Sequence, residues 1–174
     1  CQPAFFGAPN IRKRSIEHFL EELKWVQGLG FREVMFNDAT LTADMDWAFS
    51  LFEGLIRNNM DLTWNCSTRA ERINSEILSL MKKAGCHTIA LGMESVDPTV
   101  LKNIRKNINP AQVKEAVSLI RKHGMDTILF CVVGFPGETI ESIKKTIAFL
   151  KTLDTTFITL GIAVPAPGTD FYKY

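Results

Sequence analysis

Polar side chains stand directly after the apolar runs of the sequence, where they could form a binding site. Asp38 and Thr40 follow one such run, Arg69 follows the next, and Glu94 and Ser95 follow the third. Carboxylates pair with ammonium groups or ribose hydroxyls, and a guanidinium pairs with a carboxylate. If these runs end at one edge of a sheet, the residues together predict a site that holds a zwitterion.

The stretch GFPGE after the fourth apolar run indicates a different kind of contact. Gly134 and Gly137 allow the backbone to approach a flat ring and to offer N–H and C=O groups to its edge. Glu138 adds a carboxylate, and Pro165 follows the fifth run. Each residue also has an ordinary explanation, as a turn former or as a carboxylate favoured at a helix start. We nevertheless expect these residues to form a binding site, because all of them follow apolar runs that are predicted to be strands.

Hydrophobic periodicity predicts that helices and strands alternate along the chain. The expected strands cover 31–38, 62–68, 87–95, 127–133 and 156–164. The expected helices cover 15–27, 43–59, 75–85, 110–124 and 139–153, and a further helix starts at Asp97-Pro98. Strands joined through helices are βαβ units, which predict an α/β fold with a parallel sheet. Ligands of such folds bind at the carboxyl ends of the strands.

Capping side chains mark where several helices begin. Ser15, Thr42 and Asn74 are the expected N-caps of three of them, and Asn109-Pro110 opens a fourth. The continuous apolar run TILFCVV at 127–133 predicts a strand that is buried on both faces.

Length and composition narrow the class of protein. The 174 residues fit one domain, and the formal net charge of +1 argues against a dominant nucleic-acid or anionic-membrane surface. No apolar run approaches the roughly 18 residues of a membrane span. The four cysteines form no CxxC pair, so neither a disulfide framework nor an internal zinc site is expected, and a cytoplasmic, reducing location fits best. We expect Cys66, Cys86 and Cys131 to be small buried hydrophobic residues.

Six stretches of the sequence, taken in order, resemble the core of radical S-adenosylmethionine (SAM) enzymes. They are CQPAFFGAPNIRKRSIEHFLEEL, FNDATLT, WNCSTRAERI, IALGMESVDPTVLKNIRK, FCVVGFPGETIES and PAPGTDFYKY. The likeness is greatest to the branch that often carries a cobalamin-binding domain upstream. It covers essentially the whole chain and implies one radical SAM core domain over residues 1–174, truncated at the N-terminus. The implied fold is a partial (β/α)6 TIM-like barrel of parallel strands that lacks the first strand here.

The resemblance also implies a metal ligand. The family binds a [4Fe-4S] cluster through a CxxxCxxC loop, so Cys1 corresponds either to the third cluster ligand or to the residue that follows it. Three thiolates are needed to hold such a cluster. We therefore expect the chain by itself to be inactive.

The remaining implied contacts are to SAM. Asp38 and Thr40 correspond to positions near the amino group of the methionine moiety, Arg69 to a position near its carboxylate, and Glu94 and Ser95 to a ribose or methionine contact. The adenine side of the site is represented by a pattern that matches GxIxGxxGE, with Phe130 in place of its first glycine. Its cofactor-binding positions, together with Pro165, are Val132, Gly134, Gly137 and Glu138.

The implied activity is reductive cleavage of SAM at the cluster, which yields a 5′-deoxyadenosyl radical. A parent enzyme of this kind is an oxidoreductase, a cyclase or a cobalamin-dependent methyltransferase, with a small-molecule substrate and an electron donor such as flavodoxin or ferredoxin. Three alternatives stay open: a non-catalytic binding domain of the same fold, a lyase or aldolase barrel, and a tRNA-modifying radical SAM enzyme. The residues at the strand ends favour the radical SAM enzyme. We expect this enzyme to have neither a membrane nor a nucleic acid as a partner.

Overall fold

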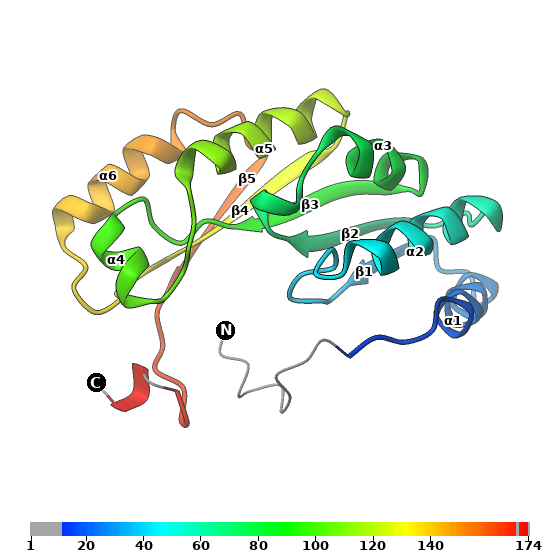
Figure 1. Ribbon diagram of the computed structural model, residues 1–174, viewed down its shortest axis with the longest axis horizontal. Coiled ribbons are helices and arrows are strands. Elements are labelled where there is room, and N and C mark those ends of the chain that lie inside the picture. The colour runs from blue at the N-terminus through cyan, green and yellow to red at the C-terminus, as the bar shows by residue number, and fades with distance from the viewer. Residues whose placement is uncertain (1–11, 170, 174) are drawn as a thin grey trace.

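A computed structural model describes residues 12–169 and 171–173 of the chain (Figure 1). Five parallel strands form one sheet in the order β1-β2-β3-β4-β5. Their bounds are Glu33–Phe36, Thr63–Thr68, Cys86–Gly92, Asp126–Val133 and Phe157–Ile162. The predicted parallel α/β fold is confirmed, and every predicted strand is present, although all except β4 are shorter than expected.

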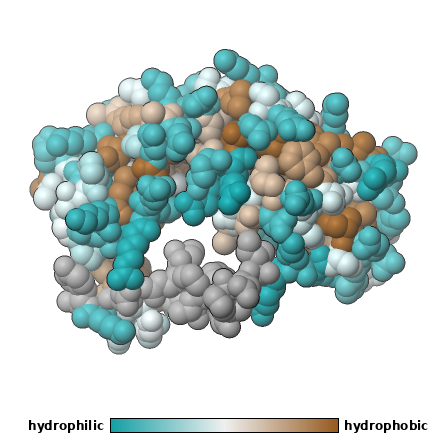
Figure 2. Space-filling model, in the orientation of Figure 1, coloured by the Kyte–Doolittle hydropathy of each residue, from teal (hydrophilic) through white to brown (hydrophobic). Residues whose placement is uncertain are grey.

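Six α-helices lie between or before the strands. They are α1 (Ile16–Gly28), α2 (Met45–Arg57), α3 (Ser75–Lys83), α4 (Pro98–Asn103), α5 (Pro110–Lys122) and α6 (Ile140–Leu150). Two short 3-10 helices, η2 (Ala70–Arg72) and η3 (Phe171–Lys173), complete the described elements. Figure 1 shows α3, α5 and α6 along one side of the curved sheet. In the face seen in Figure 2, polar residues cover most of this helical surface, with apolar residues between them.

The buried core lies between the sheet and these helices. Trp64 of β2 is fully buried and stacks on Phe52 of α2, with ring centroids 5.2 Å apart. Its indole Nε1 donates a hydrogen bond of 2.7 Å to the Ala84 carbonyl oxygen, so that the ring is fixed at both its flat face and its edge. This packing makes β2 and β3 a rigid base for the loops that follow them.

Local signals placed most helix starts correctly. The side chains of Ser15 and Asn74 accept hydrogen bonds from His18 N and Ile77 N, as expected of N-caps. The prediction for Thr42 is wrong, because Asp44 caps α2 by accepting from Trp47 N. Thr42 is fully buried and its hydroxyl bonds to that of Thr68 instead, so a tertiary contact replaces the local one.

The prediction that the run TILFCVV is buried on both faces is also wrong. Thr127, Leu129 and Cys131 are buried under the helices, whereas Phe130 on the opposite face of β4 is 39% exposed. An apolar run fixes no face by itself, since successive strand residues point to opposite sides of the sheet. The described residues therefore leave the inner face of the sheet only partly covered.

The predicted role of the internal cysteines is confirmed. Cys66, Cys86 and Cys131 are free thiols and all three are buried. Cys1 lies outside the described residues. In the part of the chain that the structure describes, no three or more His, Cys, Asp or Glu side chains are grouped to hold a metal ion. Nor does any helix there have the length and apolarity needed to cross a membrane.

Candidate functional site

The candidate site residues follow the carboxyl ends of all five strands. Asp38 comes two residues after β1, Arg69 directly after β2, Glu94 two residues after β3, Gly134 directly after β4, and Pro165 three residues after β5. Because the strands are parallel, these ends lie at one edge of the sheet. We call this edge, with residues 37–40, 69, 94–95, 134–138 and 165, the rim.

Glu94 has the most constrained backbone of the rim. Its φ of +61° lies in the left-handed region, which costs a non-glycine residue roughly 1–2 kcal/mol. The turn is held from the β4 side, where Phe130 O accepts hydrogen bonds from Met93 N at 2.9 Å and from Glu94 N at 3.2 Å. Backbone strain of this kind persists where the surrounding structure overdetermines it, and it concentrates at functional sites.

The Glu94 carboxylate is only half satisfied. Lys106 Nζ donates a hydrogen bond of 2.5 Å to Oε1, while Oε2 is buried and has no hydrogen-bond partner among residues 12–169 and 171–173. A buried carboxylate oxygen without a donor is costly, because it has lost water without gaining a partner. Oε2 is therefore an acceptor available to an ammonium or hydroxyl group of a ligand.

Lys106 is a site residue that sequence reasoning missed. It lies in the connection between α4 and α5, twelve residues after Glu94, and no local pattern signals the pairing. Gly92 at the end of β3 makes room for the pair. A Cβ atom on Gly92 would lie 2.9 Å from Lys106 Nζ and 3.3 Å from Glu94 Oε1, closer than ordinary contacts.

Burial and the Glu94 carboxylate raise the pKa of the Cys131 thiol to about 11, while the Lys106 ammonium acts in the opposite direction. Cys131 is therefore a neutral thiol at physiological pH. It acts as a packing residue, since nucleophilic or metal-binding cysteines need thiolate character.

Ser95 has a fully buried side chain whose hydroxyl is used within the protein. Its Oγ accepts a hydrogen bond from Asp97 N at 3.1 Å and lies 3.3 Å from Thr146 Oγ1 of α6. The hydroxyl thus stabilises the turn that carries Glu94.

The GFPGE loop is held in a defined shape by two side chains. Glu138 Oε2 accepts hydrogen bonds from Gly134 N and, at 3.4 Å, from Phe135 N. Asn103 Nδ2 of α4 donates to Pro136 O at 2.8 Å. Gly137 has a φ of +82°, and a Cβ atom there would lie 2.6 Å from Asn103 Nδ2. The loop therefore requires glycine at this position.

The other predicted residues are more open. Asp38 is exposed at the rim, and Thr40 Oγ1 donates to Ala39 O at 2.8 Å. Arg69 is exposed and forms an ion pair with Glu71. Val132 is half-buried beside Gly161 of β5, and Pro165 is exposed. Parallel topology brings these residues to one edge, and among them Glu94, Ser95 and Glu138 have side chains that hydrogen-bond to residues of other loops or to the backbone of their own turn.

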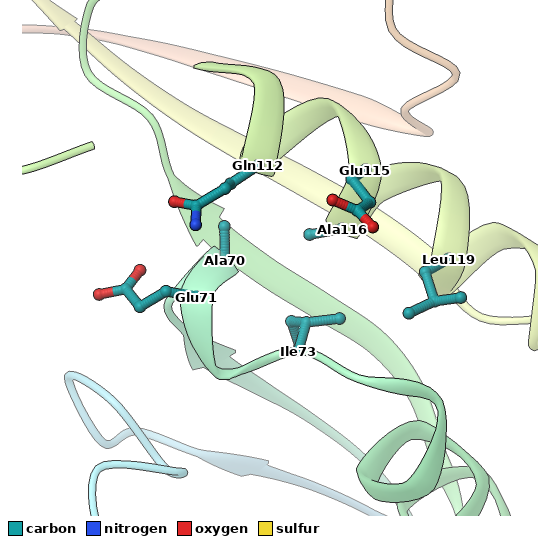
Figure 3. A pocket seen from close by; sticks show the side chains of 7 residues that line it. All are labelled: Ala70, Glu71, Ile73, Gln112, Glu115, Ala116 and Leu119. Atoms are coloured by element: carbon teal, nitrogen blue, oxygen red, sulfur yellow. The ribbon is translucent and has the colours of Figure 1, made fainter. Parts of the chain in front are cut away.

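A separate hollow lies on the helical side of the sheet, where η2 packs against α5 (Figure 3). In Figure 3, Gln112, Glu115 and Leu119 of α5 face Ala70 and Ile73. The hollow combines two carboxylates with aliphatic side chains, and its lining includes no candidate rim residue.

Comparison with known proteins identifies the family. The model of the radical SAM superfamily matches residues 1–150. The chain belongs to the radical SAM superfamily. The resemblance predicted from the six sequence stretches is thereby confirmed.

Two curated relatives are methyltransferases by name. An uncharacterized methyltransferase of Pyrococcus horikoshii is 35% identical over 100% of this chain. The bacteriochlorophyllide d C-12(1)-methyltransferase of Chlorobaculum tepidum is 27% identical over 98% of it. The chain spans 38% of the length of each relative.

Among solved structures, the radical SAM methyltransferase TsrM of Kitasatospora setae, with cobalamin and a [4Fe-4S] cluster bound, superposes with a TM-score of 0.83. It is 18% identical, and the match covers 88% of this chain and 32% of that one. At this identity the likeness shows the fold. The predicted partial TIM-like barrel of the radical SAM family is thus confirmed.

The described residues fit one of the two cofactors that the family implies. The unpartnered Glu94 Oε2 and the glycine loop at 134–138 offer an acceptor and accessible backbone, which suit the ammonium, ribose and adenine groups of SAM. For the [4Fe-4S] cluster the described residues provide no ligand group. Its predicted ligand, Cys1, is outside them.

Proposed function

We propose that this chain is the SAM-binding core domain, over residues 1–174, of a radical SAM enzyme. The observation that carries the proposal is the buried Glu94 Oε2 at the rim of a radical SAM barrel, for which the described part of the chain supplies no hydrogen-bond donor. An ammonium or ribose hydroxyl of SAM would supply that donor. Bound SAM supplies the radical chemistry of the family.

The chain's own residues divide the work of binding. Glu94 Oε2 accepts a hydrogen bond from SAM, and Lys106 holds the carboxylate in place by donating to Glu94 Oε1. The adenine contacts the backbone of Gly134 and Gly137 and packs against Val132. Glu138 holds the loop in shape by accepting a hydrogen bond from Gly134 N. These preformed contacts orient the cofactor at little cost in ordering.

On the opposite side of the rim, Arg69 binds the methionine carboxylate and Asp38 and Thr40 bind its amino group. The ion pair between Arg69 and Glu71 can break when SAM binds, because exposed ion pairs contribute little free energy. Pro165 closes the site after β5. Ser95 contributes by fixing the turn at Glu94.

The finer assignment is to a methyltransferase that uses cobalamin in the full-length enzyme. It is supported by the names of the two curated relatives and by the cobalamin-bound TsrM structure. Cys1 is assigned as a ligand of the [4Fe-4S] cluster. The enzyme acts in the cytoplasm on a small molecule, with electrons from a flavodoxin or ferredoxin.

The test is SAM binding by the anaerobically reconstituted full-length enzyme, measured by calorimetry. Glu94→Gln removes the charged acceptor and is expected to raise Kd by roughly 10- to 100-fold, the value of one hydrogen bond to a charged group. Glu115→Gln, in the hollow on the helical side, is the matched control and should bind as the wild type does. Equal affinity of the Glu94→Gln and wild-type enzymes would refute the assignment.

A further inference from the structure

Two buried hydroxyls connect helix α6 to the turn that carries Glu94. Thr146 is 4% exposed and Ser95 is fully buried, although 51 residues separate them in the sequence. Their oxygens lie 3.3 Å apart, and Thr146 Oγ1 also accepts a hydrogen bond of 3.2 Å from Val96 N. Ser95 Oγ accepts one of 3.1 Å from Asp97 N.

One assignment of protons satisfies every contact in this group. Thr146 Oγ1 donates to Ser142 O at 3.1 Å, and this uses its single hydrogen. The hydroxyl of Ser95 must then donate to Thr146 Oγ1, whose two lone pairs accept from Ser95 Oγ and from Val96 N. The result is a directed chain from Asp97 N through Ser95 and Thr146 to Ser142 O.

This series of hydrogen bonds supports the turn that carries Glu94 from the side opposite β4. Phe130 O holds the backbone N–H groups of Met93 and Glu94, while the hydroxyls hold those of Val96 and Asp97. Glu94 lies between the two anchors, in its left-handed conformation. With either anchor removed, the backbone can relax to an ordinary conformation and move the carboxylate.

We propose that Thr146 is a positioning residue for Glu94, acting on SAM binding from helix α6 without touching the ligand. The proposal rests on the proposed function of Glu94 as a SAM ligand. A threonine that only bonds back to the carbonyl four residues earlier is common in helices and carries no such meaning. Thr146 differs because a backbone N–H and a hydroxyl from outside its helix both converge on its oxygen.

Thr146→Val in the full-length reconstituted enzyme tests the proposal. The change keeps the shape of the side chain and leaves Val96 N without its acceptor. We expect the Kd for SAM to rise roughly fivefold, the net value of about one hydrogen bond. Thr146→Ser restores the hydroxyl and should bind within twofold of the wild type. Thr152→Val removes an exposed hydroxyl just beyond α6, which bonds Phe149 O, and should have no effect.

A double-mutant cycle with Glu94→Gln separates positioning from general damage to the fold. If Thr146 acts through Glu94, Thr146→Val should add nothing to the Kd of the Glu94→Gln enzyme. A fivefold loss in both backgrounds, or an unchanged Kd in the wild-type background, overturns the proposal. If Thr146→Val does not fold, Ser95→Ala removes the adjoining hydroxyl and is judged by the same cycle.

Amide hydrogen exchange distinguishes failure of this proposal from failure of the proposed function. Thr146→Val should accelerate exchange at Val96 and Asp97, whose N–H groups depend on the hydroxyls, and Thr146→Ser should not. Absence of SAM binding by the wild-type enzyme would refute the proposed function, whereas unchanged exchange at Val96 and Asp97 would refute the anchoring role of Thr146.

Discussion

Removing Lys106 should expose how strongly the fold depends on neutralising Glu94. In Lys106→Met the aliphatic stem is kept and the ammonium is lost. Neither oxygen of the Glu94 carboxylate then has a hydrogen-bond partner among the described residues, because Oε2 already lacks one and Oε1 loses Lys106 Nζ. We expect the free energy of unfolding of the chain to fall.

The size of the loss follows from the burial of the pair. Removing one partner of a fully buried ion pair costs roughly 3–5 kcal/mol, whereas exposed pairs are worth about 0–1 kcal/mol. Here the side chain of Glu94 is 17% exposed, that of Lys106 is 32% exposed, and the N–O distance is 2.5 Å. This intermediate burial places the expected loss at about 2 kcal/mol.

Urea unfolding followed by circular dichroism measures this loss. Arg57→Met is the matched control, since it breaks the ion pair of Arg57 with Glu53, whose side chains are 70% and 56% exposed; it should cost less than about 0.5 kcal/mol. Adding Glu94→Gln to Lys106→Met removes the unpaired carboxylate and should restore part of the lost free energy of unfolding. A Lys106→Met protein as stable as the Arg57→Met protein would refute the view that the pair is buried enough to matter.

Two further predictions concern stability. Gly85→Ala should lower the free energy of unfolding by about 3 kcal/mol, because Gly85 has a φ of +98° and the new Cβ would lie 2.3 Å from Leu62 O. In the same urea experiment, the control Gly28→Ala should cause no measurable loss, because a Cβ atom at Gly28 would have no atom within 4 Å. The Cys131 thiol has a pKa raised from 9.0 to about 11, so between these pH values the unfolded chain releases a proton that the folded chain keeps. Stability should therefore decline from pH 9 to 11, by up to roughly 3 kcal/mol, and a Cys131→Ala protein with an equally steep decline would contradict this.

The sequence predicted the fold well because its signals are local. Asp97 and Asn109 each precede a proline and accept backbone hydrogen bonds from the first turn of their helices. Each βαβ unit then has one favoured handedness, so correct helices and strands already define a parallel sheet. The resemblance to the radical SAM family predicted the same fold, and it also predicted which residues at the rim bind the cofactor.

The contacts that give those positions their roles could not be predicted, because they join distant residues. Nothing near Ser95 in the sequence indicates that its hydroxyl meets Thr146, and nothing near Glu94 indicates Lys106. Thr42 was misassigned for the same reason, since its partner Thr68 lies on another element. Side-chain chemistry identifies what a residue can bind, whereas packing decides which partner it meets.

Packing therefore separates residues that recognise a ligand from residues that support them. Glu138 and Ser95 both match family positions for cofactor binding, yet both spend hydrogen-bonding capacity on the backbone of their own loops. Glu94 alone among these three keeps a buried acceptor without a partner. On the proposed function, a substitution at Glu94 should remove a contact to SAM, whereas one at Ser95 or Glu138 should weaken binding by letting a loop move. The effect of a Ser95 substitution should disappear in the Glu94→Gln background, because Ser95 holds the turn that positions that carboxylate. The effect of a Glu138 substitution should persist there, because Glu138 holds the loop at 134–138.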